Sequence, residues 1–211
     1  MKNTAKIAIA LSLALSGMVQ ANNGGTSPTE NKFTTTIYTI PDSITGPDNW
    51  DATKYPRMLA DVNGDGKDDL VGFHGSNVVV AFSNGRSFNN INLATLNSVF
   101  GYYSGGWRID KHPRLMADIN GDGKDDIVAF AHGGVGIALS NGNGFDTPKT
   151  GVLNFGYGQG WHIEHHERMM ADVNGDGMQD IVGFGGTGVS VAISNGNGFN
   201  PAELWSDSFG N

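Results

Sequence analysis

Three nine-residue segments carry acidic and amide side chains at the spacing of a calcium-binding loop. In the second segment, DINGDGKDD, aspartate or asparagine fills positions one, three, five and nine, and the Lys124 carbonyl falls at position seven. Gly123 at position six permits a sharp turn, and Ca²⁺ prefers an oxygen-only shell. The sequence therefore predicts three Ca²⁺ sites. Their expected ligands are Asp61, Asn63, Asp65, Lys67 and Asp69, then Asp118, Asn120, Asp122, Lys124 and Asp126, and finally Asp172, Asn174, Asp176, Met178 and Asp180.

Two other interpretations of these acidic segments are weaker. An EF-hand requires glutamate at position twelve, where the three segments have Gly72, Ala129 and Gly183, and the flanking patterns are those of strands. Alternatively, the Asp-Gly and Asn-Gly pairs form turns without any ion. All four ligand positions are filled in all three copies, which favours metal binding. Because no nucleophile or base is adjacent in sequence, we expect the ion to be structural and not catalytic.

A second group of residues lies between a tryptophan and an arginine that precede each acidic segment. Sugars present C–H faces that stack on aromatic rings and hydroxyl groups that need paired donors and acceptors. Tryptophan beside carboxylate, histidine and arginine supplies both, so we expect a sugar pocket here. The candidate residues are Trp107, Arg108, Asp110, His112 and Arg114 with Tyr102, then Trp161, His162, Glu164, His166 and Arg168 with Tyr157, and in the first copy Trp50, Tyr55 and Arg57.

The same residue types have alternative roles. The tryptophans can pack between sheets instead of stacking on a sugar, and the arginines can bind loop carbonyls. The first copy has Tyr55 where the others have histidine, so its pocket is expected to be weaker or absent. The histidines of the third copy could ligate zinc, but the H-E-x-x-H pattern is not met, because Met170 stands where its second histidine belongs.

Short strands in an internal repeat position both groups of residues. Each copy reads tryptophan to arginine, A-D-(V/I)-N-G-D-G, an apolar strand and S-N-G-x-x-F. The second apolar strand of each copy alternates at period two, and the Asn-Gly pair after it signals a hairpin, because both residues tolerate positive φ. Four strands in each unit predict the blades of an all-β propeller. The expected strands are residues 57–60, 70–73 and 78–82, their counterparts in the other copies, and segments that follow Phe33, Phe88, Phe145 and Phe199.

The repeats suggest how the chain is organised into segments. Residues 1–21 have the positive start, apolar run and small-residue cleavage site of a signal peptide, and residues 22–32 read as a flexible leader. Residues 33–211 form the repeat domain, with repeats at about 33–87, 88–144 and 145–198 and a terminal strand at 199–211. Three blades are too few to close a ring of about 4–8. We therefore expect a homo-oligomer, most simply a dimer with a six-bladed ring.

Composition excludes several classes of partner. The 32 glycines lack collagen spacing and cluster with Asn, Asp and Ser, which is typical of tight turns between strands. The formal net charge of −8 argues against nucleic acid and anionic membranes as partners. No apolar run is long enough to span a bilayer, so we expect a secreted protein, extracellular or periplasmic, without membrane insertion. The absence of cysteine leaves metal sites as the substitute for disulfides.

The acidic segments and their flanks resemble known repeats. The pattern D-x-N-G-D-G-x-x-D followed by an apolar strand is similar to the FG-GAP/VCBS repeats of integrin α-chain propellers and many exported bacterial proteins. The longer frame GGWRIDKHPRLMADINGDGKDDIVAF, residues 105–130, resembles the Psathyrella velutina-type lectins. That resemblance implies a seven-bladed propeller that binds N-acetylglucosamine and sialylated glycans in pockets between blades. This chain departs from the pattern in having three repeats and in altering the tryptophan-to-arginine segment of two of them.

These observations together predict a secreted, calcium-binding lectin for N-acetylglucosamine or sialic acid type glycans. The alternative is an integrin-like adhesion propeller that binds protein and no sugar; an exposed apolar patch would favour it. We do not expect an enzyme. The chain has no G-x-S-x-G motif, no cysteine and no isolated carboxylate pair outside the acidic segments.

Overall fold

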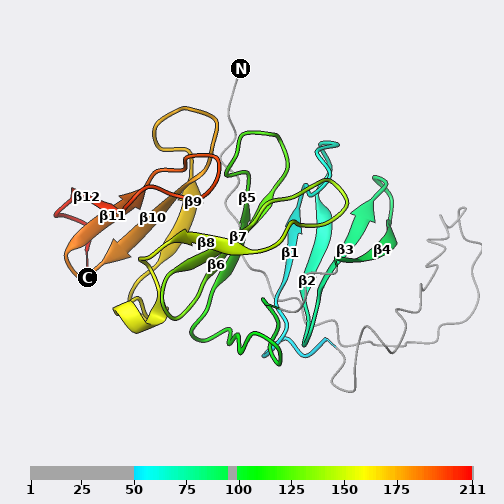
Figure 1. The fold of residues 1–211 in the computed structure, drawn as a ribbon, viewed down its shortest axis with the longest axis horizontal. Coiled ribbons are helices and arrows are strands. Elements are labelled where there is room, and N and C mark those ends of the chain that lie inside the picture. The colour runs from blue at the N-terminus through cyan, green and yellow to red at the C-terminus, as the bar shows by residue number, and fades with distance from the viewer. Residues whose placement is uncertain (1–49, 95–98, 211) are drawn as a thin grey trace, which may run out of the picture. The chain divides into compact units, whose positions relative to one another are not determined.

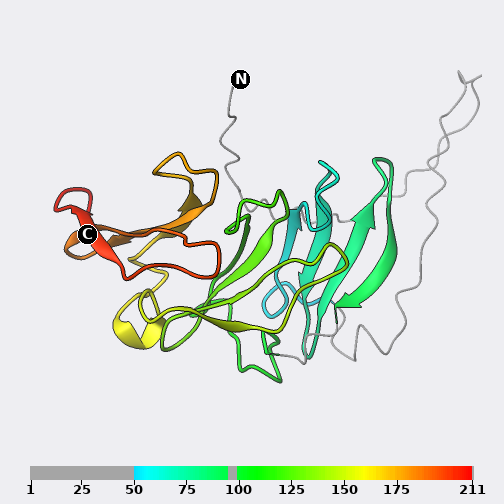
Figure 2. The same ribbon diagram turned by 45° about the horizontal axis from the view of Figure 1, so that its top comes forward.

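The computed structural model describes residues 50–94 and 99–210, which lie in the second of two compact units, Tyr38–Asn211. The predicted signal peptide, the predicted leader and the start of the first repeat lie outside these residues. The described part holds three antiparallel sheets of four strands, each in simple chain order. Figures 1 and 2 show the sheets following one another along the chain. No described helix is long and apolar enough to cross a membrane.

Each sheet takes its first three strands from one copy of the repeat and its fourth strand from the segment that follows that copy. The strands of the first sheet are β1 (Arg57–Ala60), β2 (Asp69–Phe73), β3 (Val78–Ser83) and β4 (Phe88–Ala94). Those of the second are β5 (Arg114–Ala117), β6 (Asp126–Phe130), β7 (Val135–Ala138) and β8 (Lys149–Val152). Those of the third are β9 (Arg168–Ala171), β10 (Asp180–Gly185), β11 (Gly188–Ala192) and β12 (Glu203–Ser206). A 3₁₀ turn, η1 (Tyr157–Gln159), lies in the connection between the second and third sheets.

The hydrophobic core lies between successive sheets. One cluster joins Val71 and Phe73 of β2 to Ile127 and Ala129 of β6, and a second joins the other face of β6 to the third sheet. All five residues of β6 are therefore buried, whereas β2 and β10 include partly buried residues. Burial on both faces explains why these strands read as continuous apolar runs. Packing of sheet on sheet in this way is that of propeller blades.

The turns that contain the Asn-Gly pairs differ from the expected two-residue hairpin. Gly85 has a φ of 82°, but among the described residues Asn84 is not one of those with positive φ. Instead the Asn84 side chain accepts hydrogen bonds from the backbone N–H groups of Arg86 and Ser87, both at 2.9 Å. The asparagine thus organises a longer turn through its side chain, which is the common behaviour of this residue in loops.

Candidate functional site

The acidic loops between the first and second strands are held around their first aspartate. In the first loop, one carboxylate oxygen of Asp61 accepts from the N–H groups of Gly64 at 2.8 Å and Asp65 at 3.1 Å, and the other accepts from Gly66 at 2.7 Å. Gly64 and Gly66 have φ values of 76° and 81°, which favour glycine. The second and third loops repeat the bonds to the glycines. The loop backbone thus folds around a carboxylate.

Lysine side chains lie against the acids of two loops. The Lys67 ammonium is 2.7 Å from Asp65, and the Lys124 ammonium is 2.6 Å from Asp122. The hydrogen bond from Lys67 is the largest cause that lowers the pKa of Asp65. The third loop has Met178 at the lysine position, so its acids have no such cation. The three predicted sites therefore differ in local charge.

The aspartate at position nine has a second role that the sequence analysis did not anticipate. Asp126 is fully buried, and its two oxygens accept from the N–H groups of Ile119 at 3.1 Å and Ser140 at 2.7 Å. Burial raises its pKa to about 7, because desolvation outweighs these two hydrogen bonds. The carboxylate thereby ties the start of the loop to the chain just after β7. The same bonds are made by Asp69 and Asp180.

The donor set of each loop fits Ca²⁺. Among residues 50–94 and 99–210, no three His, Cys, Asp or Glu side chains already stand together as a metal site. The predicted ligand atoms of each loop are nevertheless all oxygens, on a backbone that bends sharply at its glycines. An oxygen-only shell is what Ca²⁺ requires. The Asp61 oxygen that accepts only the N–H of Gly66 still has lone-pair capacity for a cation. The residues present are therefore compatible with the predicted ion.

The tryptophans lie in the core, which favours their packing role. Trp107 and Trp161 are 6% and 9% exposed and belong to the clusters between sheets. Trp161 packs on Gly183 of β10, where an added Cβ would lie 2.6 Å from the ring. Trp50 packs on Gly72 of β2 in the same manner. Sheet packing covers most of the Trp107 and Trp161 rings, which favours a packing role, although Trp107 also forms part of a cavity wall.

The arginines bind loop carbonyls. Arg114 donates to the carbonyl of Phe100 at 3.2 Å, and Arg168 donates to that of Phe155 at 3.1 Å. Both guanidinium groups are buried, and burial lowers the pKa of each to about 10. Arg57, the third candidate, is exposed. The two buried arginines thus act between sheets, although Arg168 also lines a cavity of about 600 Å³.

The first accessible cluster forms around Tyr102, in the connection between the first and second sheets. The Arg108 guanidinium lies 3.8 Å from the centroid of the Tyr102 ring and donates to the Tyr102 carbonyl at 2.9 Å. Tyr55, from the first copy, meets Tyr102 edge to face at 6.2 Å but is fully buried, whereas the Lys54 ammonium of that copy lies 5.8 Å from the centroid of the Tyr102 ring. Tyr103, the next residue, is exposed. Residues of two successive copies therefore share one aromatic and cationic surface.

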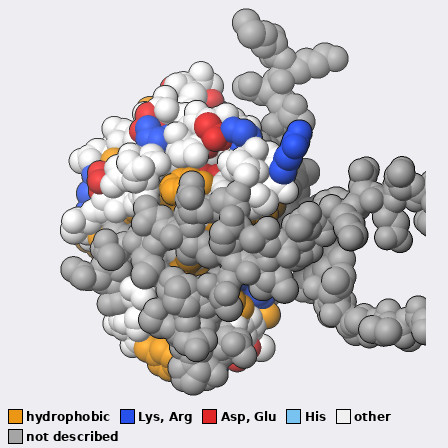
Figure 3. Space-filling model, turned by 90° about the vertical axis from the view of Figure 1, so that its right-hand side faces the viewer, with side chains coloured by type: hydrophobic (Ala, Val, Ile, Leu, Met, Phe, Trp, Pro, Cys, Tyr) orange, Lys and Arg blue, Asp and Glu red, His pale blue; other side chains and the backbone are white. Residues whose placement is uncertain are grey.

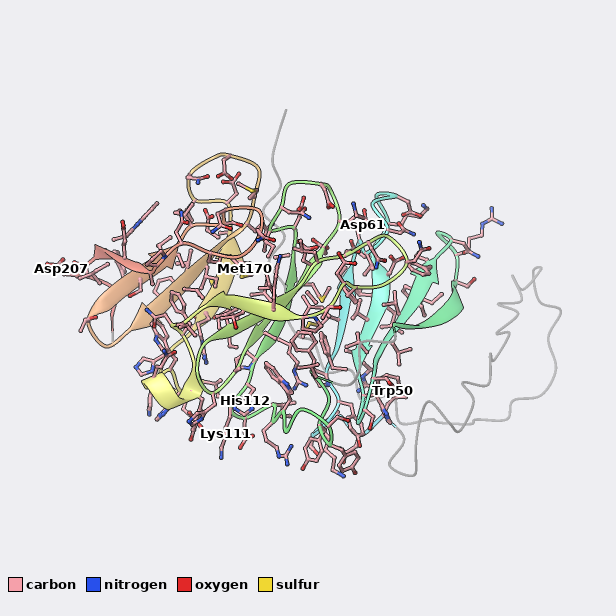
Figure 4. The ribbon with its side chains drawn as sticks, viewed as in Figure 1. Trp50, Asp61, Lys111, His112, Met170 and Asp207 are labelled. Atoms are coloured by element: carbon pink, nitrogen blue, oxygen red, sulfur yellow. The ribbon has the colours of Figure 1, made fainter. Side chains whose placement is uncertain are left out.

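The second accessible cluster repeats this arrangement around Tyr157. The His162 ring stacks on Tyr157 at 4.6 Å, and the Lys111 ammonium lies 5.3 Å from the same ring. His112 and His132 each approach Tyr157 at 6.2 Å. Lys111 and His112 belong to the second copy and His162 to the third. Figure 4 shows Lys111, His112 and Trp50 at the end of the strands opposite Asp61.

A cavity of about 480 Å³ lies beside His112. Burial lowers the pKa of His112, and the charges of Arg114 and His132 add to this effect, which favours the neutral imidazole. Its Nδ1 accepts the N–H of Arg108 at 3.2 Å, so its proton is on Nε2. The cavity walls are Val99, Ser104, Gly105, Trp107, His112, Ala131, His132 and Gly133.

No protein-family model matches the chain, and no curated protein sequence matches it. Among solved structures, it is similar to an Agrocybe aegerita lectin described by its specific recognition of non-reducing terminal N-acetylglucosamine. The TM-score is 0.72 and the identity 38%, over 77% of this chain and 42% of that chain. The chain is also similar to part of the structure of TcdB2-TccC3-Cdc42, with a TM-score of 0.51 and 25% identity, over 63% of this chain and 6% of that one.

The chain has a lectin-type β-propeller fold. It spans 42% of the length of the Agrocybe lectin chain that it matches. Within this fold, the structure gathers the predicted residues Tyr102 and Arg108 in one cluster and Tyr157, His112 and His162 in the other. Asp110 and Glu164 are exposed, and Glu164 and His166 line a separate cavity of about 600 Å³.

Two contributors to these clusters, Lys111 and His132, were not predicted. Lys111 lies inside the tryptophan-to-arginine segment, so the segment itself was a signal for it. His132 lies in the turn between β6 and β7. The equivalent turn of the first copy contains His74, which packs against Tyr55 at 4.3 Å. Recurrence of histidine just after the second strand of two copies was the available sequence signal.

Proposed function

We propose that the protein is a lectin that binds glycans ending in N-acetylglucosamine at the junctions between successive sheets. The observation that carries this proposal is the pair of aromatic and cationic clusters around Tyr102 and Tyr157, each built from two copies of the repeat. The similarity to a lectin that recognises this sugar supports it. Sialylated glycans are the second ligand class, because Arg108 and Lys111 can pair with a carboxylate.

The cavity beside His112 supplies the chemistry for an N-acetylated sugar. Val99 and Ala131 in the cavity wall offer apolar contact to the acetamido methyl group. Tyr157 lies outside this wall, 6.2 Å from His112, and would extend the aromatic surface for the C–H groups of the pyranose. The Nε2–H of neutral His112 donates to a sugar oxygen, and the second histidine in the wall, His132, adds another polar group. A single site of this kind binds weakly, and two sites on one rigid chain gain strength through effective concentration.

Calcium has a supporting part in this proposal. Bound Ca²⁺ would neutralise the acidic loops and stabilise the sheets, with the predicted oxygen ligands holding it. The loop of Asp61 lies at the opposite end of the strands from His112 (Figure 4). We therefore propose a structural ion that does not contact the sugar. Export, through the signal peptide predicted at residues 1–21, would bring the lectin to glycans outside the cytoplasm.

Binding to a glycan array tests the sugar proposal. Glycans with a terminal N-acetylglucosamine are expected to retain the protein, and free N-acetylglucosamine is expected to release it. An Arg108→Ala variant removes the cation that stacks on Tyr102 and is expected to weaken retention. Trp205→Ala, which removes an aromatic ring that is 50% exposed on β12, is the matched control and should bind as the unmodified chain does. Retention of no glycan at high protein concentration overturns the proposal.

The adhesion alternative also has one observation in its favour. Leu204 and Trp205 on β12 are 55% and 50% exposed, so adjacent apolar side chains face solvent on the outer strand of the third sheet. Exposed apolar groups of this kind suit a protein partner. Loss of a protein partner in Trp205→Ala, together with unchanged sugar binding, would separate this function from the lectin function.

A further inference from the structure

Adjacent sheets are joined by a polar contact that occurs twice. Ser140 donates its hydroxyl to the carbonyl of Val62, and Ser194 donates to that of Ile119, both at 2.5 Å. Val62 and Ile119 are fully buried by this packing, whereas Val173, at the same position of the third copy, is 38% exposed. The third sheet therefore presents the acceptor side of this contact to solvent.

A second recurring contact places a guanidinium group over a phenylalanine of the preceding sheet. Arg114 lies 5.4 Å from the centroid of Phe73 on β2, and Arg168 lies 5.4 Å from that of Phe130 on β6. Both phenylalanines are fully buried. Phe184 occupies the same position on β10 and is only partly buried. The third sheet thus leaves the Phe184 ring partly exposed, where the other two sheets have a phenylalanine covered by an arginine.

The carbonyls that accept from these arginines belong to Phe100 and Phe155, which are 2% and 0% exposed. Phe209 is the third member of this set, since it precedes glycine as they do, and it is 82% exposed. Its φ of 61° matches the 62° of Phe155, in a region that non-glycine residues rarely adopt. The backbone of Phe209 therefore already has the conformation that at Phe155 receives Arg168.

The first sheet presents the opposite halves of the same contacts. Arg57, at the start of β1, is exposed, although both of its counterparts are buried. Phe88, at the start of β4, is 42% exposed, whereas Phe145 and Phe199 are 7% and 5% exposed. Ser83 is the counterpart of the two serines that join the sheets. Figure 3, which views the molecule from the β4 side, shows hydrophobic side chains among polar ones on this side.

We propose that these two faces bind each other between copies of the chain, head to tail. Arg57 of one copy donates to the Phe209 carbonyl of the other and lies over its Phe184, and Ser83 donates to the Val173 carbonyl. A second copy is the occupant because its described residues carry the complementary half of each of these contacts, in the arrangement that the chain already uses twice. Since donors and acceptors lie on different faces, the interface is heterologous, and it can close into a ring.

This interface also completes a cavity. The space of about 600 Å³ beside Arg168 is walled by Phe184 and Phe209, two of the residues that the proposed interface covers. The first sheet of the second copy would supply its opposite wall. The proposal stands on packing alone and does not depend on sugar binding.

The mass of the purified chain in solution, by light scattering and sedimentation, tests the proposal. The 22.3 kDa chain is expected to form a multiple of that mass, with the dimer as the simplest ring. Arg57→Glu removes the donor face, and Phe184→Lys places a cation on the acceptor face, where it repels Arg57 of the other copy. Each variant alone is expected to be a folded monomer by circular dichroism. Leu204→Asp, at an exposed residue outside the contact set, should leave the mass unchanged.

Mixing the two variants separates this interface from any symmetric one. Arg57→Glu retains an intact Phe184 face, and Phe184→Lys retains an intact Arg57 face, so the mixture is expected to form a one-to-one pair through the single good interface. A monomeric unmodified chain overturns the proposal. So does a multimer that persists in both variants, or a mixture of folded monomers that does not pair.

Discussion

The ring of Tyr157 stacks on that of His162, with centroids 4.6 Å apart and planes inclined by 28°. The tyrosine comes from the connection between two sheets, and the histidine from the segment that follows Trp161. Lys111 of the preceding copy lies 5.3 Å from the same tyrosine ring. Tyr157 therefore holds together residues of two copies that the sequence keeps far apart.

Replacing Tyr157 by alanine is expected to weaken the binding of an N-acetylglucosamine-terminated oligosaccharide roughly two- to tenfold, because an aromatic contact contributes about 0.5–1.5 kcal/mol. Tyr157→Phe keeps the ring and is expected to retain most of the affinity. Titration calorimetry measures both. Equal affinities for Tyr157→Ala and the unmodified chain would place the sugar elsewhere.

Gly156 sets the position of this tyrosine. A Cβ added there would lie 2.5 Å from the backbone nitrogen of Gly134 and 2.6 Å from the carbonyl oxygen of His132. Because backbone atoms cannot move aside, Gly156→Ala is expected to lower the free energy of unfolding by about 1–3 kcal/mol. Urea denaturation measures this. Gly186→Ala, where an added Cβ meets nothing within 4 Å, is the control and should change stability little; equal effects would contradict the argument.

Chelation of divalent ions is expected to lower the melting temperature. If the loops bind Ca²⁺ at a hundred times its dissociation constant, each site contributes about 2.7 kcal/mol, and 1 kcal/mol corresponds to about 2–4 °C for a domain of this size. Scanning calorimetry with and without EDTA measures the shift. Added Ca²⁺ should restore the melting temperature, and Mg²⁺ should restore less. A melting temperature unchanged by exhaustive chelation would refute the calcium prediction.

The lysine of the second loop is expected to compete with the ion. The Lys124 ammonium lies 2.6 Å from Asp122, a predicted ligand, and the third loop has Met178 in its place. Lys124→Met, which copies the third loop, is therefore expected to raise the Ca²⁺ affinity of the second loop severalfold. Calcium titration followed by calorimetry measures it. Lys149→Met removes a lysine outside the loops and should leave the affinity as it is.

Asp126 is expected to make stability depend on pH when calcium is absent. Burial raises its pKa from 3.8 to about 7. Between these values the folded state binds more protons than the unfolded state, so the contribution of Asp126 to the free energy of unfolding falls as pH rises from about 4 to about 7. Urea denaturation in EDTA at pH 5 and pH 7.5 measures the slope of the free energy of unfolding against pH, for the unmodified chain and for Asp126→Asn.

The asparagine variant cannot titrate and is expected to lose the part of the slope that belongs to Asp126. It is also expected to be less stable at pH 5 by about 1–3 kcal/mol, because its amide places a donor against one of two backbone N–H groups. Asp146→Asn, at an exposed residue, is the control and should keep the full slope. Equal slopes for the chain and Asp126→Asn would contradict the assignment.

Much of the fold follows from local patterns in the sequence. The period-two alternation of residues such as Val135 and Ile137, the acidic loops and the recurring tryptophans predict four strands in each of three units, and the structure confirms them. These signals are local because a strand between two packed sheets must be apolar and a sharp turn must contain residues that tolerate it. The hairpin turns were less predictable, since the Asn84 side chain replaces the positive φ expected of its backbone.

The roles of individual side chains were decided only by tertiary structure. Trp161 and Arg168 have the residue types of a sugar pocket, yet sheet packing covers the ring with Gly183 and turns the guanidinium toward the Phe155 carbonyl. Asp126 has the spacing of a metal ligand and is in addition a buried acceptor for backbone N–H groups. Spacing along the chain determines which side chains lie in one loop or strand. Whether a side chain is buried depends on the sheet that packs against it, and that contact joins residues from different copies of the repeat.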